Sequence, residues 1–153
     1  NIGNIAEGDI WSDPLRVYPP PDVLSVEAPE PIRSTFQEGA VCFTARAHVA
    51  TAIMCRKALE GACALHKVSE SNLAKSLEVM KTKGLIDARL FEWADELRLA
   101  GNEAVHEVGA TVSREDARDM LDFTKAILDY LFSFRDKFER FKERRKKRPK
   151  DKP

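Results

Sequence analysis

The chain has 153 residues, of which 43% are hydrophobic and 33% are charged. This composition is typical of a folded, helix-rich domain and excludes a disordered chain. The formal net charge is zero, but residues 139–153 hold nine Lys and Arg against three Asp and Glu, so the rest of the chain is acidic. A basic end on an acidic body predicts contact with a polyanion, or serves only to keep the chain in solution.

The cysteines and histidines show no spacing that would bind a metal. Cys42, Cys55 and Cys63 form no Cys-x-x-Cys pair, which favours buried, reduced thiols in a cytoplasmic protein. We expect no metal and no cofactor. The sequence shows no signal peptide and no apolar run of membrane-spanning length, so we expect no membrane partner. Because the chain begins at Asn1 and not at Met, a missing upstream or partner domain is a further expectation.

The N-terminal segment, residues 1–28, contains the run Tyr18-Pro19-Pro20-Pro21 and little helical periodicity. Proline fixes φ and removes a backbone donor, so we predict an extended, Pro-rich arm with a short strand at residues 15–18. A helical bundle is expected over residues 29–141, followed by a basic tail over residues 142–153.

Apolar residues recur at helical spacing from about residue 29 onward. A first helix is expected to bury Ile32, Phe36, Ala40 and Phe43. A second, over residues 47–66, is apolar almost all the way round, which predicts a central position. A third is expected over residues 71–83 and ends at Gly84, and a fourth extends from about residue 87 to a point before Gly109. The expected core face of the fourth helix consists of Leu90, Ala94, Leu97, Gly101, Ala104 and Val108.

The segment Ser113-Arg114-Glu115-Asp116 resembles a capping box that opens a long fifth helix. If this helix continues to Lys147, it spans about 50 Å, so its end either frays or packs on a partner. The residues expected to face inward are Ala117, Met120, Leu121, Ile127, Leu128, Leu131, Phe134, Phe138 and Phe141. The overall prediction is an all-α antiparallel bundle of about five helices.

Three polar residues, Arg98, Asn102 and His106, recur every fourth residue of the fourth helix. Successive members are offset by about 40°, so they form one polar stripe. A cation and an imidazole on one surface suit the binding or cleavage of a phosphodiester. The alternative is a solvated helix edge, in which Asp95 and Arg98 form a local pair and His106 is a cation at a helix C-terminus.

Two charged residues, Arg56 and Glu60, lie four residues apart on the nearly apolar second helix. Charges are costly to bury unless they are paired. We therefore expect Arg56 and Glu60 to bond to each other, either as a structural ion pair or as a functional cation with its support.

The segments YPPP, FQEGAVCFTARAHVATAIMCRKALEGAC and ELRLAGNEAVHE resemble the bacterial family called domain of unknown function 4145 over about residues 15–135. That family is similar to the HEPN superfamily of helical bundles, which includes metal-independent ribonucleases of defence and toxin systems. The HEPN motif is an Arg, a polar residue, three further residues and a His. Asn102 and His106 match it, whereas Gly101 stands at the arginine position and Arg98 lies one turn earlier.

The resemblance implies an RNA-directed domain that forms a homodimer, with metal-independent ribonuclease activity as one hypothesis. In it, His106 acts as general base or acid, Arg98 stabilises the phosphorane with Arg56 in reserve, and Asn102 orients His106 or a phosphate oxygen. Glu60 supports Arg56. The cations expected to bind RNA are Arg144, Arg145, Lys146, Lys147 and Arg148.

The alternative hypothesis is a non-catalytic dimerisation or interaction module attached to a nuclease or defence system. Gly101, in place of the motif arginine, favours this alternative, because Gly101 and Ala104 permit close helix contact. A nucleotide-binding domain is a third hypothesis, but the chain has no glycine-rich phosphate loop to support it.

Overall fold

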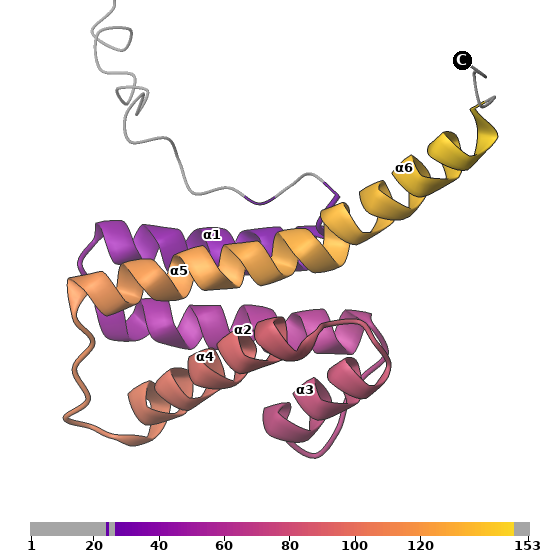
Figure 1. Cartoon of the computed structure of the whole chain (residues 1–153). Coiled ribbons are helices and arrows are strands. Elements are labelled where there is room, and N and C mark those ends of the chain that lie inside the picture. The colour runs from indigo at the N-terminus through magenta and orange to yellow at the C-terminus, as the bar shows by residue number, and fades with distance from the viewer. Residues whose placement is uncertain (1–23, 25–26, 149–153) are drawn as a thin grey trace, which may run out of the picture.

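The computed structural model describes Leu24 and residues 27–148, and the described part forms helices without strands (Figure 1). The helices are α1 (Glu30–Thr44), α2 (His48–Leu65), α3 (Leu73–Thr82), α4 (Ala88–His106), α5 (Arg114–Asp129), the π-helical segment η1 (Tyr130–Phe134) and α6 (Arg135–Lys147). The predicted all-α bundle is thus confirmed. The expected arm and the strand at residues 15–18 lie almost wholly outside the described residues. The boundary of the basic tail stays a prediction.

The centre of the bundle is α2, which contacts α1, α3, α4 and α5. Its buried positions are mostly small, including Ala52, Cys55, Ala58 and Ala62. Small side chains let neighbouring helices approach closely, and the central position predicted from the all-round apolar pattern follows from this. None of the described helices is both long enough and apolar enough to cross a membrane.

Helices α2 and α4 approach each other closely at Gly101. A Cβ atom added to Gly101 would lie 2.7 Å from the Cβ atom of Arg56. The stem of Arg56 therefore occupies the space that a side chain at residue 101 would need. The predicted core face of α4 is confirmed at Ala94, Leu97, Gly101 and Ala104.

Two parts of the predicted core are wrong. Val108 is fully exposed because α4 ends at His106, two residues earlier. Phe134, Phe138 and Phe141 are 56%, 57% and 47% exposed. Phe134 is the last residue of η1, and the other two lie on α6, which runs past the end of the bundle (Figure 1) and, among the described elements, contacts only η1. The remaining predicted core positions of the fifth helix are buried, namely Ala117, Met120, Leu121, Ile127, Leu128 and Leu131.

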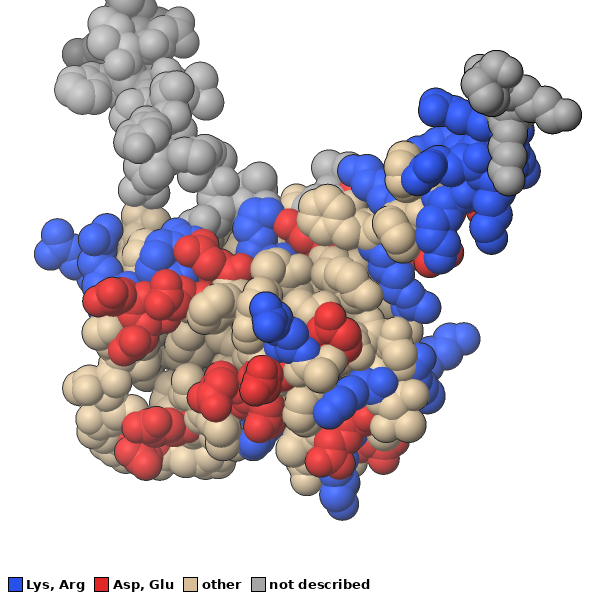
Figure 2. All heavy atoms as spheres, viewed as in Figure 1, with Lys and Arg blue, Asp and Glu red and all other residues tan. Residues whose placement is uncertain are grey.

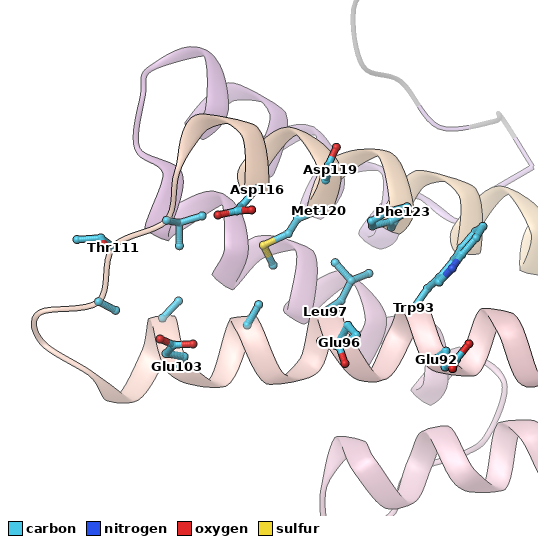
Figure 3. A pocket seen from close by; sticks show the side chains of 14 residues that line it. Glu92, Trp93, Glu96, Leu97, Glu103, Thr111, Asp116, Asp119, Met120 and Phe123 are labelled. Carbon is cyan, nitrogen blue, oxygen red and sulfur yellow. The ribbon is translucent and has the colours of Figure 1, made fainter.

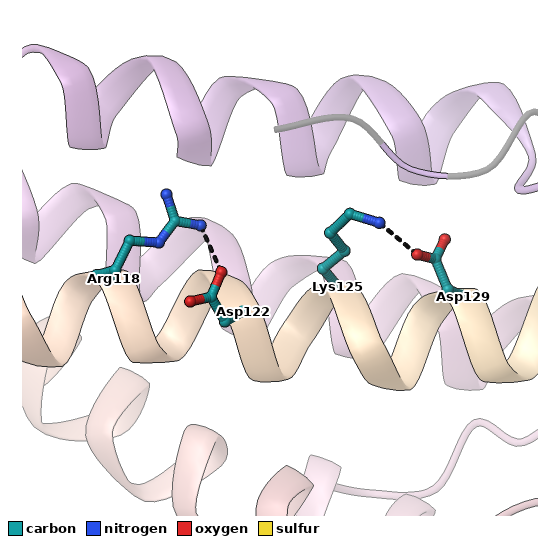
Figure 4. Close-up of polar contacts among 4 residues, drawn as sticks. All are labelled: Arg118, Asp122, Lys125 and Asp129. Carbon is teal, nitrogen blue, oxygen red and sulfur yellow. Dashed lines mark hydrogen bonds and ion pairs between the residues drawn. The ribbon is translucent and has the colours of Figure 1, made fainter. Parts of the chain in front are cut away.

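The start of α5 is fixed by the predicted cap, in which the Asp116 N–H donates to Ser113 Oγ at 2.9 Å. Along α5, Arg118 pairs with Asp122 at 2.7 Å and Lys125 pairs with Asp129 (Figure 4). The Arg118 guanidinium also lies 5.1 Å from the ring centre of Phe43 on α1. An exposed pair within one helix, such as Arg118–Asp122, stabilises little by itself, whereas the cation–π contact of Arg118 with Phe43 joins α5 to α1.

The close contact at Gly101 predicts that Gly101→Ala destabilises the fold. Overpacking costs about 1–3 kcal/mol, against about 1 kcal/mol gained in helix propensity, so we expect a net loss of up to about 2 kcal/mol. Urea unfolding measures this loss. The control is Gly109→Ala, because a Cβ there meets nothing within 4 Å. Equal stability of the two variants would contradict a tight α2–α4 contact.

A second prediction concerns His66, which stacks on Phe132 of η1 with ring centres 5.2 Å apart. Burial lowers the pKa of His66 below its ordinary value of 6.5, and the positive charge of Arg135 lowers this pKa further. The negative charge of Asp136 has the opposite, smaller effect and raises it. The unfolded chain then binds the proton more readily than the folded one, so stability falls as the pH drops below 6.5.

We expect His66→Gln to reduce the loss of stability between pH 7.5 and pH 5.5, measured by urea unfolding at both values. His106→Gln, at an exposed helix end, is the control. If His66→Gln loses as much stability between pH 7.5 and pH 5.5 as the wild type, protonation of His66 is not the cause of that loss.

Candidate functional site

The cation predicted on α2 is paired as expected. Arg56 Nε donates to Glu60 Oε1 at 2.9 Å. The two side chains are 21% and 45% exposed, so the pair lies at the rim of the α2–α4 contact and not within the core. The Arg56 side chain is partly exposed, whereas its Nη1 atom is buried without a hydrogen-bond partner among the described residues. The structure therefore leaves both the structural and the functional interpretation of Arg56 open.

The polar stripe on α4 is present, but only one of its three side chains, that of Arg98, forms a hydrogen bond to another described residue. Arg98 Nε donates to Asp95 Oδ1 at 2.6 Å, as the local-pair interpretation predicts. Asn102 is half-buried and His106 is exposed. Neither of these two side chains hydrogen-bonds to another described residue. The stripe therefore presents an amide and an imidazole to solvent beside a cation that is already paired.

The predicted site residues fall into two places. Arg56 packs on Gly101, next in the chain to Asn102, so the structure brings an α2 arginine to the position where the motif arginine is missing. The five cations from Arg144 to Arg148 lie on the exposed end of α6. Since α4 ends at the opposite end of the bundle from α6 (Figure 1), these cations do not join the stripe.

A groove that the sequence analysis missed lies between α4 and α5 (Figure 3) and has a volume of about 490 Å³. Its floor is apolar and includes Leu97, Ala104 and Met120. At one end stand the rings of Trp93 and Phe123, whose centres are 5.3 Å apart. A concave apolar surface of this size is typical of a binding site.

The rim of this groove is acidic, and its five carboxylates belong to Glu92, Glu96, Glu103, Asp116 and Asp119. No Lys, Arg or His is among the fourteen described residues that line it. None of the five forms an ion pair with another described residue. The uncompensated negative charge opposes phosphate and favours a cationic ligand.

The groove and the polar stripe occupy opposite edges of α4. Taking Leu97 as the origin and about 100° per residue, Arg98, Asn102 and His106 lie at about 100°, 140° and 180°. On the other side, Trp93, Glu96 and Glu103 lie at about −40°, −100° and −120°. The core seam separates Arg98 and Asn102 from the groove, whereas His106 lies only about 60° from Glu103, on the side of α4 away from the core.

The three cysteine thiols belong neither to the polar stripe nor to the groove. Burial raises the pKa of Cys55 to about 11 and that of Cys63 to about 11, so both stay protonated at neutral pH. Cys42 is half-exposed, contrary to the expectation that all three are buried. Across Leu24 and residues 27–148, no three His, Cys, Asp or Glu side chains are grouped to hold a metal ion.

The family model described as domain of unknown function, DUF4145, matches residues 37–144. The chain belongs to the DUF4145 family. The matched region includes the Arg56–Glu60 pair, the polar stripe, both walls of the groove and most of α6. No curated protein and no solved structure gives a significant match to the DUF4145 chain.

Proposed function

We propose that this DUF4145 domain is a protein-interaction module whose α4–α5 groove binds a basic, amphipathic helix. The observation that carries the proposal is the combination of an apolar floor with an uncompensated acidic rim. Helix-in-groove binding uses apolar side chains three or four residues apart as anchors. Lys and Arg that flank such anchors would face the rim carboxylates.

The two parts of the groove contribute differently to binding. Apolar side chains that enter the floor lose contact with water, and full burial of one such side chain contributes about 1.5–3 kcal/mol. The rim charges accelerate association and exclude acidic ligands more than they add affinity. Binding is therefore expected to be specific for cationic helices and to weaken as salt concentration rises.

The test is fluorescence titration of a labelled amphipathic helix with leucines on one face and lysines on both flanks. We expect saturable binding that Glu96→Lys/Asp119→Lys weakens at least tenfold, because two rim charges are reversed. Glu38→Lys/Glu78→Lys makes the same change of net charge at exposed positions outside the groove. No binding, or an equal loss in both variants, would overturn the proposal.

The second candidate is the RNA-directed, HEPN-like function. It is supported by the packing of Arg56 on Gly101, which supplies an arginine from α2 beside the Asn102…His106 motif. In this candidate, His106 exchanges the proton with the ribose 2′-hydroxyl or the leaving oxygen, and Arg56 or Arg98 stabilises the phosphorane. In this candidate, too, the homodimer is a proposal, and so are the cytoplasmic location and the defence context.

Cleavage of a panel of single-stranded and structured RNAs tests this candidate in a metal-free buffer. His106→Ala is expected to lower the rate by about 10²–10⁴-fold through loss of general acid–base catalysis. Arg56→Ala should slow cleavage as well. Arg89→Ala is the control, because it removes an exposed arginine outside the stripe and should leave the cleavage rate unchanged. RNA left intact by the wild type, or cleaved equally by His106→Ala, would eliminate the catalytic hypothesis.

A further inference from the structure

We infer that the ligand of the α4–α5 groove is α6 of a second copy of this chain. The inference rests on the proposed function of the groove and names its partner. It explains two otherwise separate features, an acidic groove with an apolar floor and a basic helix with an uncovered apolar face.

The uncovered face of α6 has the pattern of a groove-binding helix. Phe138 and Phe141 of α6 and Phe134, the last residue of η1, lie within about 60° of one another around the helix axis, and each is about half exposed. Lys137 Nζ and Lys142 Nζ lie 5.9 Å and 5.2 Å from the ring centres of Phe134 and Phe138. The aromatic stripe is thus flanked by cations on the helix itself.

Charge makes α6 and the groove complementary. The helix carries eight Lys and Arg against three Asp and Glu, while the groove carries five carboxylates and no Lys or Arg among its described lining residues. In Figure 2 the basic side chains gather on α6, away from the bundle. Complementary charge of this kind fixes the register of a helix and excludes acidic competitors.

The geometry requires α6 to come from another molecule. Within one chain, α6 continues the line of α5 and points away from the bundle (Figure 1), while α5 itself forms one wall of the groove. The groove extends along α4 from Glu92 to Ala104, about 18 Å, and α6 has a length of about 20 Å. A reciprocal exchange of α6 about a twofold axis fills both grooves and closes the assembly as a dimer.

The first experiment is sedimentation of the full chain over a concentration series. Wild type is expected to approach twice the monomer mass of 17.2 kDa. Phe138→Glu and Glu96→Lys/Asp119→Lys should each raise the dimer dissociation constant at least tenfold. Val41→Glu, at an exposed apolar residue of α1 outside the groove, should leave it unchanged. A monomer at all concentrations, or a dimer insensitive to either variant, would overturn the inference.

Mixing the variants makes the test specific. Phe138→Glu keeps an intact groove and Glu96→Lys/Asp119→Lys keeps an intact α6. A mixture should therefore form heterodimers at concentrations at which each variant alone is a monomer. Circular dichroism verifies that both variants are folded. Absence of heterodimers in the mixture would contradict the pairing of α6 with the groove.

A peptide covering residues 130–148, titrated into Phe138→Glu, separates this inference from the proposed function. Binding of that peptide supports both. Binding of the leucine–lysine helix without binding of the 130–148 peptide would overturn the second-copy inference and keep the interaction module. Binding of neither would overturn both.

Discussion

The close contact between α2 and α4 at Gly101 is the constraint on which the two surfaces of α4 depend. Because Arg56 lies against the Gly101 backbone, α4 is fixed in rotation, with Leu97 and Ala104 directed into the core. One edge of α4 then carries Asn102 and His106, and the other edge forms the groove with α5. A side chain at residue 101 would move both edges.

The net charge of zero conceals a division of the molecule into an acidic groove and a basic projecting helix. Neighbouring opposite charges within one helix would neutralise each other locally, as Arg118 and Asp122 do on α5. The carboxylates of the groove and most cations of α6 have no such local partner. A charge separation of this size favours association between copies. The same basic helix is the cationic surface on which the RNA-directed candidate relies.

The parts of the structure that sequence predicted are those set by local chemistry. The helices, the Ser113 cap, the Arg56–Glu60 pair and the Asp95–Arg98 pair all depend on residues within four positions of one another. The groove was missed because its walls come from α4 and α5, whose contact no local pattern specifies. The signal that could have revealed one wall is the spacing of Glu92, Glu96 and Glu103, which places three carboxylates on one side of α4 but does not show what lies opposite them.

The errors at Phe134, Phe138 and Phe141 have the same origin. Their periodicity continues the buried face of α5, so sequence predicts burial, but whether a helix covers that face depends on the length of the neighbouring helices. The three phenylalanines do follow helical spacing, but no described helix of the same chain covers them. The aromatic face of α6 is therefore best understood as half of an interface.

The most direct test of the account is an intermolecular paramagnetic NMR measurement. One copy, without isotope labels, carries Cys42→Ser and a spin label attached at Lys146→Cys. It is mixed with a second copy that is isotopically labelled and has no spin label. The account predicts that the Trp93 indole and Met120 methyl signals of the labelled copy broaden, and that Glu96→Lys/Asp119→Lys in that copy abolishes the effect. No broadening at the groove, or broadening confined to residues on α1, would contradict it.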